Sequence, residues 1–190
     1  MQLVILDRDG VINEDSPNHI RSADEWVPIR GSLEAIARLH QAGVRIVVAT
    51  NQPGIKRRLF SVESLNAIHG KLHRMVSEIG GHIDAIVFCP HSAKDGCGCR
   101  KPEPGMLTSV MERMHINPDS VTFVGDKASD VQAALAAGVH PVLVRSGQGE
   151  ANLEAARALT DLEVHDDLSA FVDHYLVARG ERSATTRRGS

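Results

Sequence analysis

At 190 residues and 20.6 kDa, the chain is long enough to bury the core of one domain. Its net charge of -3 gives no sign of a surface for non-specific nucleic-acid binding. No stretch has the apolar length of a membrane span, and the start of the chain lacks a signal-peptide pattern. We therefore expect a cytoplasmic monomer with neither a membrane nor a nucleic-acid partner.

The first element is a short apolar run, Leu3–Leu6, followed directly by Asp7 and Asp9. A continuous apolar run of this length predicts a strand buried on both faces of a parallel sheet. Ligands bind at the carboxyl ends of such strands, and the spacing of two residues lets the carboxylates converge. Because close carboxylates repel each other, a divalent cation such as Mg²⁺ would stabilise them. Taken alone, however, such a pair is more often two solvated acids at a strand end.

Strands and helices alternate along the rest of the chain, which predicts an α/β fold with a mostly parallel sheet covered by helices on both faces. We expect one domain over residues 1–180 and a disordered tail over 181–190. The predicted strands cover residues 44–49, 85–88, 121–126 and 141–144, and a short one lies between helices after residue 150. The predicted helices follow an N-cap at Ser32, an N-cap at Ser61, Pro104 and Lys127.

Polar residues stand at the ends of three predicted strands: Asp7 with Asp9, Thr50 with Asn51, and Asp126. The carboxyl ends of parallel strands meet at one edge of the sheet, so these side chains can share a site. Such an arrangement is unexpected by chance, and it favours a functional reading of the first two aspartates.

All three cysteines lie in one short stretch, Cys89, Cys97 and Cys99, together with His91. An odd, clustered set indicates metal binding more than disulfides, and three thiolates with one imidazole suit structural zinc. The alternative is three free cysteines beside an unrelated histidine. By contrast, His69 and His73 lie one helical turn apart without a metal motif, and we predict that they occupy a solvated face.

Four motifs resemble those of the haloacid dehalogenase superfamily, and they occur in that family's order. They are Asp7-Arg8-Asp9-Gly10, Thr50-Asn51, Lys101-Pro102, and Gly125-Asp126-Lys127 with Asp130. The resemblance implies a Rossmann-like sheet, a Mg²⁺ cofactor and an aspartyl-phosphate intermediate. The gaps between the motifs are too short for a full cap domain, so we expect an open, capless site with specificity set by loops.

The resemblance also implies roles for individual residues. Asp7 would be the nucleophile and Asp9 the general acid and base. Thr50 and Lys101 would hold the phosphoryl oxygens, and Asp130 would orient the metal site. Mg²⁺ would be held by Asp7, Asp9 through its main-chain carbonyl, and Asp126; zinc would be held by Cys89, His91, Cys97 and Cys99.

Within the superfamily, the Cys-His loop ending at Arg100-Lys101 resembles that of sugar bisphosphate phosphatases. The resemblance implies hydrolysis of the 7-phosphate of a heptose 1,7-bisphosphate, in the synthesis of a lipopolysaccharide precursor. The segment between His91 and Cys97 is short for that family, and Pro53 replaces a small polar residue. The expected substrate contacts are Asp7, Arg8, Asp9, Asp15, Ser16, Pro17, Asn18, Thr50, Asn51, Gln52, Pro53, Arg100, Lys101 and Lys127.

Other functions share some of these features. A histidinol-phosphate phosphatase would have the same motifs and a similar zinc loop, so the motifs discriminate poorly between the two. A phosphatase of nucleic-acid 3′ ends is disfavoured, because aromatic residues make up only 3% of the chain and offer few stacking platforms. A non-catalytic phosphosugar-binding module would not need the general acid Asp9.

Overall fold

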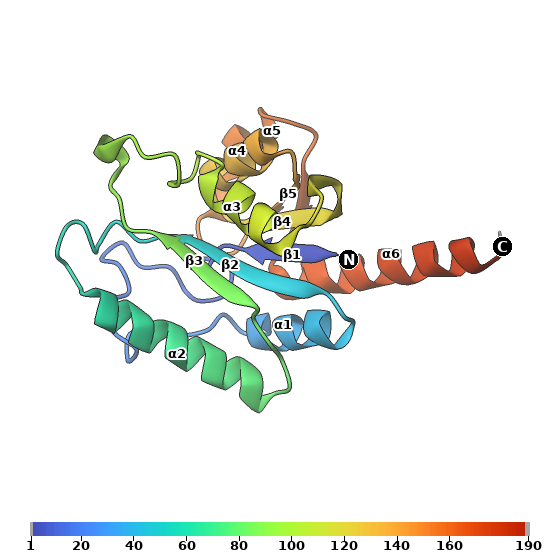
Figure 1. Ribbon diagram of the computed structural model, residues 1–190, viewed down its shortest axis with the longest axis horizontal. Helices are drawn as coiled ribbons and strands as arrows, with labels where there is room; N and C mark the ends of the chain where they lie inside the picture. The colour runs from blue at the N-terminus through green and yellow to red at the C-terminus, as the bar shows by residue number, and fades with distance from the viewer. Residues whose placement is uncertain (1, 189–190) are drawn as a thin grey trace.

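The computed structural model describes residues 2–188, with side chains described for residues 2–180. Its centre is a six-stranded sheet in the order β3-β2-β1-β4-β5-β6, in which every neighbouring pair is parallel (Figure 1). This confirms the predicted Rossmann-like α/β fold. The strands are β1 (Leu3–Leu6), β2 (Arg45–Asn51), β3 (Ala85–Cys89), β4 (Val121–Gly125), β5 (His140–Val144) and β6 (Glu163–His165).

Helices cover both faces of the sheet (Figure 1). One face packs against α1, α2 and α6, and the other against α3, α4 and α5. Their bounds are α1 (Ser32–Gln41), α2 (Val62–Glu78), α3 (Gly105–Met114), α4 (Ala128–Ala137), α5 (Gly149–Arg157) and α6 (Leu168–Arg188), with short 3-10 helices at Ala93–Asp95 and Pro118–Ser120.

β1 is the central strand, and all four of its residues are fully buried. Val4 and Leu6 belong to the core under α1, α2 and α6, whereas Leu3 and Ile5 belong to the core under α3 and α4. This alternation explains the continuous apolar run, because each residue of a doubly covered strand meets one apolar layer. The chain leaves β1 at the carboxyl edge of the sheet, where Asp7 and Asp9 follow.

The start of α1 differs from the prediction. Gly31, with φ of 82°, is the N-cap, and Ser32 is the first helical residue. The Ser32 hydroxyl instead donates a hydrogen bond of 2.6 Å to the carbonyl of Ile12. It therefore fastens the loop after β1 to the helix. The other predicted cap is confirmed: the Ser61 side chain accepts a hydrogen bond from the main-chain N–H of Ser64 and opens α2.

The position of His69 and the end of the chain differ from what the sequence led us to expect. His69 does not lie on a solvated face, because its side chain is buried between α2 and the sheet. At the end of the chain, α6 continues as helix to Arg188 through most of the segment for which we predicted a disordered tail. Residues 189–190 lie outside the described residues. Composition alone does not separate a solvated helix end from an irregular tail.

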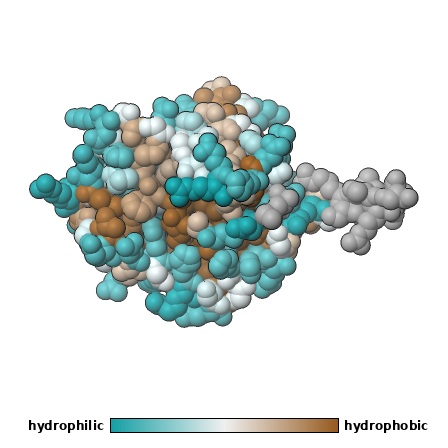
Figure 2. Space-filling model, viewed as in Figure 1, coloured by the Kyte–Doolittle hydropathy of each residue, from teal (hydrophilic) through white to brown (hydrophobic). Residues whose placement is uncertain are grey.

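The structure of residues 2–188 contains no separate cap domain, since each connection between strands is a loop with one helix. Within the same range, no helix combines the length and the apolar character needed to cross a membrane. β3 is an edge strand, and Figure 2 shows hydrophobic residues gathered in a band across the face of the molecule that carries it. The carboxyl edge of the sheet is left open by this architecture.

Candidate active site

Three aspartates converge at the carboxyl edge of the sheet. Asp7 follows β1, while Asp126 and Asp130 come from the end of β4 and the first turn of α4. All three are buried, and one carboxylate oxygen from each lies within 4.8 Å of the others. The predicted convergence of Asp7 with Asp126 is confirmed by this geometry.

The Lys101 ammonium reaches into the same cluster. Its Nζ lies 2.9 Å from Oδ1 of Asp7 and 2.8 Å from Oδ1 of Asp130, and it donates to the carbonyl of Ala49 at 3.0 Å. The side chain is almost fully buried. Burial alone would lower the pKa of Lys101, but Asp130 and Asp7 outweigh it and raise the pKa. Lys101 is therefore a fixed positive charge beside Asp7.

The carboxylate of Asp9 is not part of this cluster, although Asp9 lines the same cavity. Its oxygens accept hydrogen bonds from the Arg8 guanidinium at 2.8 and 3.0 Å, from Asn13 at 2.9 Å and from Gln52 at 2.9 Å. Burial alone would raise the pKa of Asp9, but Arg8 and the hydrogen bonds from Asn13 and Gln52 outweigh it and lower the pKa. Because these contacts occupy the Asp9 carboxylate, only the main-chain carbonyl of Asp9 is left to bind Mg²⁺, as the resemblance implies.

The polar residues at the end of β2 serve different purposes. Thr50 lines the cavity at the carboxyl edge and accepts a hydrogen bond of 2.9 Å from Gln52. Asn51 binds the backbone of Lys101 twice, as donor to its carbonyl at 3.0 Å and acceptor from its N–H at 3.2 Å. β2 therefore fixes the position of the segment that carries Lys101.

A loop after β5 closes the other side of the cluster. The Gln148 N–H donates to Oδ2 of Asp126 at 2.9 Å, and its side-chain amide donates to Oδ2 of Asp15 at 2.6 Å. Lys127 lies between the same two acids, with Nζ 2.8 Å from Oδ1 of Asp126 and 3.5 Å from Oδ2 of Asp15. Sequence reasoning missed this loop, although Ser146, Gly147 and Gln148 follow a predicted strand just as the other site residues do.

The electrostatics of the three aspartates fit a bound cation. Burial raises the pKa of Asp7. Burial, followed by repulsion from Asp7, raises the pKa of Asp126 to about 7. Lys127 Nζ contacts both oxygens of Asp126, at 2.8 and 3.0 Å, and so places a positive charge beside the carboxylate, as a bound metal ion would. Hard oxygen donors in a crowded anionic cluster suit Mg²⁺.

A cavity of about 450 Å³ opens over this cluster. Eleven of the fourteen predicted substrate contacts line it, whereas Arg8, Asn18 and Gln52 do not. Arg8 and Gln52 are buried and hold Asp9, and Asn18 faces a neighbouring hollow. The cavity is lined by Asp7, Asp9, Asp15, Ser16, Pro17, His19, Thr50, Asn51, Pro53, Ala93, Arg100, Lys101, Pro102, Lys127, Ser129, Asp130 and Gln148.

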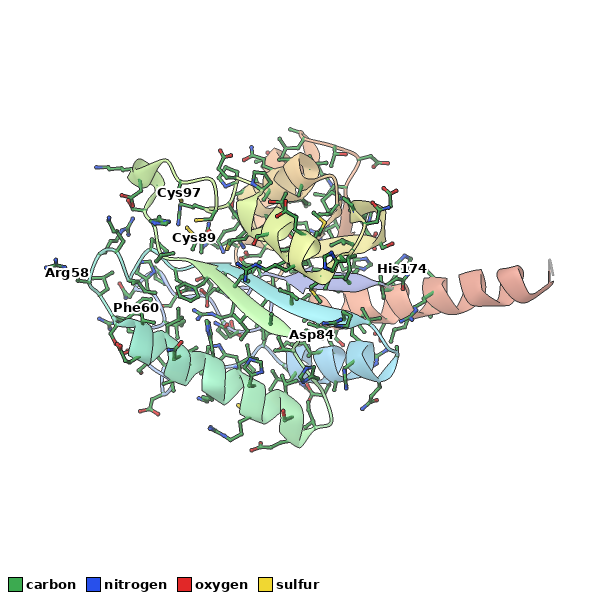
Figure 3. The ribbon with its side chains drawn as sticks, in the orientation of Figure 1. Arg58, Phe60, Asp84, Cys89, Cys97 and His174 are labelled. Carbon is green, nitrogen blue, oxygen red and sulfur yellow. The ribbon has the colours of Figure 1, made fainter. Side chains whose placement is uncertain are left out.

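The cysteine loop joins β3 to α3 beside this cavity, and Figure 3 shows Cys97 near Cys89, the last residue of β3. The three sulfurs lie 3.3–3.6 Å apart, and Nδ1 of His91 lies 3.5 Å from Cys89 and 3.4 Å from Cys99. A tetrahedral zinc site with Zn–S of about 2.3 Å has edges of roughly 3.8 Å between sulfurs. The cluster is therefore compatible with zinc.

The loop also carries Arg100 and Lys101 into the site. Arg100 lines the cavity and donates from Nη1 to the carbonyl of His91 at 3.2 Å. The two basic residues come directly after Cys99 in the chain. The geometry of the cysteine cluster therefore helps to position them, together with Asn51.

Comparison with known proteins supports this description. A family model described as "HAD-hyrolase-like" matches residues 98–171. The chain is 51% identical over 170 residues to a D-glycero-beta-D-manno-heptose-1,7-bisphosphate 7-phosphatase of Pseudomonas putida, which covers 90% of this chain and 97% of that protein. A protein of the same name from Bordetella bronchiseptica is 47% identical, with 93% and 98% of the two chains covered.

Solved structures give the same result. A D,D-heptose 1,7-bisphosphate phosphatase from B. bronchiseptica, complexed with magnesium and phosphate, has a TM-score of 0.89 and 46% identity over 94% of this chain and 99% of that one. The corresponding structure from Burkholderia thailandensis has a TM-score of 0.74 and 45% identity over 93% and 99%.

The parallel sheet, the aspartate cluster at its carboxyl edge and the matching family model define the class as the haloacid dehalogenase superfamily. Within it, the identity over nearly the whole chain is decisive. The chain belongs to the family of D-glycero-β-D-manno-heptose-1,7-bisphosphate 7-phosphatases.

Proposed function

We propose that the chain is a Mg²⁺-dependent phosphoric monoester hydrolase that removes the 7-phosphate of D-glycero-D-manno-heptose 1,7-bisphosphate. The observation that carries this proposal is the placement of Asp7 beside Lys101 and Asp126 in a cavity wide enough for a phosphosugar. The named relatives favour this substrate over histidinol phosphate. The reaction would supply a heptose monophosphate for lipopolysaccharide precursor synthesis.

In the first step, an oxygen of Asp7 attacks phosphorus while the bond between phosphorus and the sugar oxygen breaks. Asp9 donates a proton to the leaving sugar oxygen. In the second step, Asp9 takes a proton from water, which attacks phosphorus and releases phosphate from Asp7. Lys101 and Thr50 stabilise the negative charge on the phosphoryl oxygens during both steps.

Arg8 and Asn13 matter in this scheme because they hold the Asp9 carboxylate in one orientation. The lowered pKa of Asp9 favours its ionised form, which accepts a proton from water in the second step. Asp9 must therefore bind a proton before it acts as the acid of the first step. The carboxylates of Asp7 and Asp126, with the main-chain carbonyl of Asp9, would hold Mg²⁺, and Asp130 would orient them. The ion would supply positive charge to the phosphoryl group.

We further propose that Cys89, His91, Cys97 and Cys99 hold a structural Zn²⁺. All four positions would be filled by protein, so this ion would stabilise the loop and take no part in the chemistry. The support is that the three sulfurs and one imidazole nitrogen all lie within 4.8 Å of one another. Reduced, clustered cysteines also favour a cytoplasmic location.

The domain organisation and the oligomeric state belong to the same proposal. We propose that residues 1–180 form one domain that acts as a monomer without a nucleic-acid or membrane partner. Light scattering of the purified chain at several concentrations would test the oligomeric state, and a mass of about twice 20.6 kDa would contradict the monomer.

The decisive experiment measures phosphate release with Mg²⁺ from heptose 1,7-bisphosphate and from histidinol phosphate. We expect a clear preference for the bisphosphate and a loss of turnover of about 10⁴-fold or more in Asp7→Asn. Asp161→Asn, which changes an exposed acid outside the site, serves as the matched control. Undiminished turnover in a folded Asp7→Asn variant would refute the covalent step, and a preference for histidinol phosphate would refute the substrate.

A further inference from the structure

A second cluster of titratable side chains lies away from the active site, at the edge of the sheet where β5 and β6 meet α6. His140 is the first residue of β5, and Glu163 and His165 are the ends of β6. His174, which Figure 3 labels, lies on α6. Alternate residues of a strand face the same side of a sheet. His140, Glu163 and His165 therefore share one face, and α6 covers that face.

The register of the two strands brings these residues together. Val142 of β5 pairs with Glu163, and Val144 pairs with His165. Val142 and Val144 are buried in the core that includes Phe171 of α6. Since His140 lies two residues before Val142, it faces the same helix.

Three imidazole nitrogens point at one carboxylate. Nε2 of His140 lies 2.8 Å from Oε2 of Glu163, Nε2 of His165 lies 2.7 Å from Oε1, and Nε2 of His174 lies 4.0 Å from Oε1. The rings of His165 and His174 are 5.3 Å apart. Side chains from three separate elements thus converge on the two oxygens of Glu163.

The cluster borders a hollow of about 480 Å³ that His140, Glu163 and His174 line together with Asp119 and Tyr175. The side chains of His140 and His174 are 55% and 63% exposed, whereas that of His165 is 15% exposed. The His165 side chain is therefore held in place by its surroundings, whereas those of His140 and His174 have room to turn.

We propose that His140, Glu163, His165 and His174 form a binding site for a divalent transition metal such as Zn²⁺ or Ni²⁺. Imidazole nitrogen and carboxylate oxygen are ligands that both ions accept. The nitrogens must come to about 2.0–2.1 Å from the ion. The exposed side chains of His140 and His174 must therefore turn to reach it, since Nε2 of His174 now lies 4.0 Å from Oε1 of Glu163. The ion takes the place of protons that the imidazoles now donate to Glu163, and it ties α6 to β5 and β6.

Calorimetric titration of the full chain with Ni²⁺ tests this site. The chain is first given one equivalent of Zn²⁺ and an excess of Mg²⁺, so that the cysteine loop and the aspartate cluster are both filled. We expect one further equivalent of Ni²⁺ to bind. His140→Ala and His174→Gln should each weaken this binding at least about 10-fold, as the loss of a metal ligand does.

His82→Ala, which removes an exposed histidine outside the cluster, is the matched control and should bind Ni²⁺ like the parent. Circular dichroism and phosphatase turnover verify that each variant is folded. His174 is mostly exposed, so its replacement leaves the core intact. Absence of the further equivalent, or equal Ni²⁺ binding by the parent and both cluster variants, would overturn the proposal.

Discussion

Gln148 shows how a residue outside the family motifs contributes to the site. The preceding Gly147 has φ of 62° and lies against Gly10 and Asp126, with no space for a Cβ atom. This close approach lets Gln148 reach Asp126 through its backbone and Asp15 through its side chain. Gln148 thus links a proposed metal ligand to the loop that we expect to contact the sugar.

We expect Gln148→Leu to raise the KM for the heptose bisphosphate about 10-fold, because one hydrogen bond that fixes the Asp15 loop is lost. Turnover of a small aryl phosphate, which lacks the distal part of the sugar, should change less than about twofold. Steady-state kinetics with both substrates makes the measurement. Gln41→Leu, on an exposed part of the chain, is the control, and an equal loss with both substrates would contradict a role in substrate positioning.

His69 is the other residue whose role the sequence did not reveal. Its Nε2 lies 3.4 Å from Nη1 of Arg8, and Arg8 in turn binds Asp9. Because arginine only donates, the imidazole accepts this hydrogen bond and must be neutral. Burial, with the adjacent charge of Arg8, lowers the pKa of His69 to about 3.

This shift predicts a pH-dependent loss of stability. An unfolded histidine, with a pKa near 6.5, binds a proton that the folded one with a pKa of about 3 does not. The contribution of His69 to the free energy of unfolding is therefore complete above about pH 6.5 and declines as the pH falls toward 3. The slope is at most about 1.4 kcal/mol per pH unit, or roughly 2 kcal/mol by pH 5.

His69→Asn keeps a hydrogen-bond acceptor but removes the titrating group, so this variant should lose less stability between pH 7 and 5 than the parent does. Urea denaturation at a series of pH values measures the difference. His82→Asn, at an exposed position, should keep the slope of the parent. Parallel pH profiles for the parent and His69→Asn would show that His69 is not the responsible group.

The cysteine loop is the element that joins metal binding to catalysis. Only the segment from Cys99 to Lys101 separates the sulfur cluster from the ammonium beside Asp7. Loss of the loop's geometry would therefore displace Lys101 without changing any residue of the aspartate cluster. The proposed zinc would act on the rate by positioning Lys101.

We expect Cys97→Ser to lower turnover by about 10- to 100-fold, in the range seen when groups supporting a metal site are lost. Replacement of the metal by Co²⁺ should give a thiolate-to-cobalt absorption band in the parent and a much weaker one in the variant. Lys94→Ala, at an exposed position of the same loop, is the control and should retain both properties. Full turnover in Cys97→Ser without bound metal would rule out the positioning role.

The elements themselves were largely predictable, for a specific physical reason. Buried strands such as Leu3–Leu6 are apolar on both faces, so the run stands out, and polar residues that follow it mark the carboxyl edge. Asp7, Thr50 and Asp126 were found in this way. The roles of Arg8, His69 and Gln148 were not found in this way, because they depend on contacts between elements far apart in the chain.

At the scale of the whole molecule, α6 completes the fold by covering the sheet face that also carries α1. Phe171 is 1% exposed within this core, and Asp173 of the same helix pairs with Arg38 of α1 at 2.6 Å. Tyr175 extends the contact to Gln2, to which its hydroxyl donates at 3.1 Å. The last described helix is thus part of the main core, although it carries none of the four motifs.

We expect Phe171→Ala to lower the free energy of unfolding by about 3–5 kcal/mol, since it leaves a cavity in a close-packed core. Val177→Ala on the same helix, at a position 63% exposed, should cost less than about 0.5 kcal/mol. Chemical denaturation monitored by circular dichroism compares the two variants. Similar small losses for both would mean that α6 docks only loosely on the sheet.

The walls of the cavity come from five separate connections, those that follow β1, β2, β3, β4 and β5. Each wall begins and ends on a rigid strand or helix, so its length and chemistry can change while the three aspartates and Lys101 keep their places. A new substrate would then require an exchange of surface segments, with no redesign of the interior. Grafting the residues 13–19 of this chain onto a distant superfamily member should move substrate preference before it alters the rate of the chemical step.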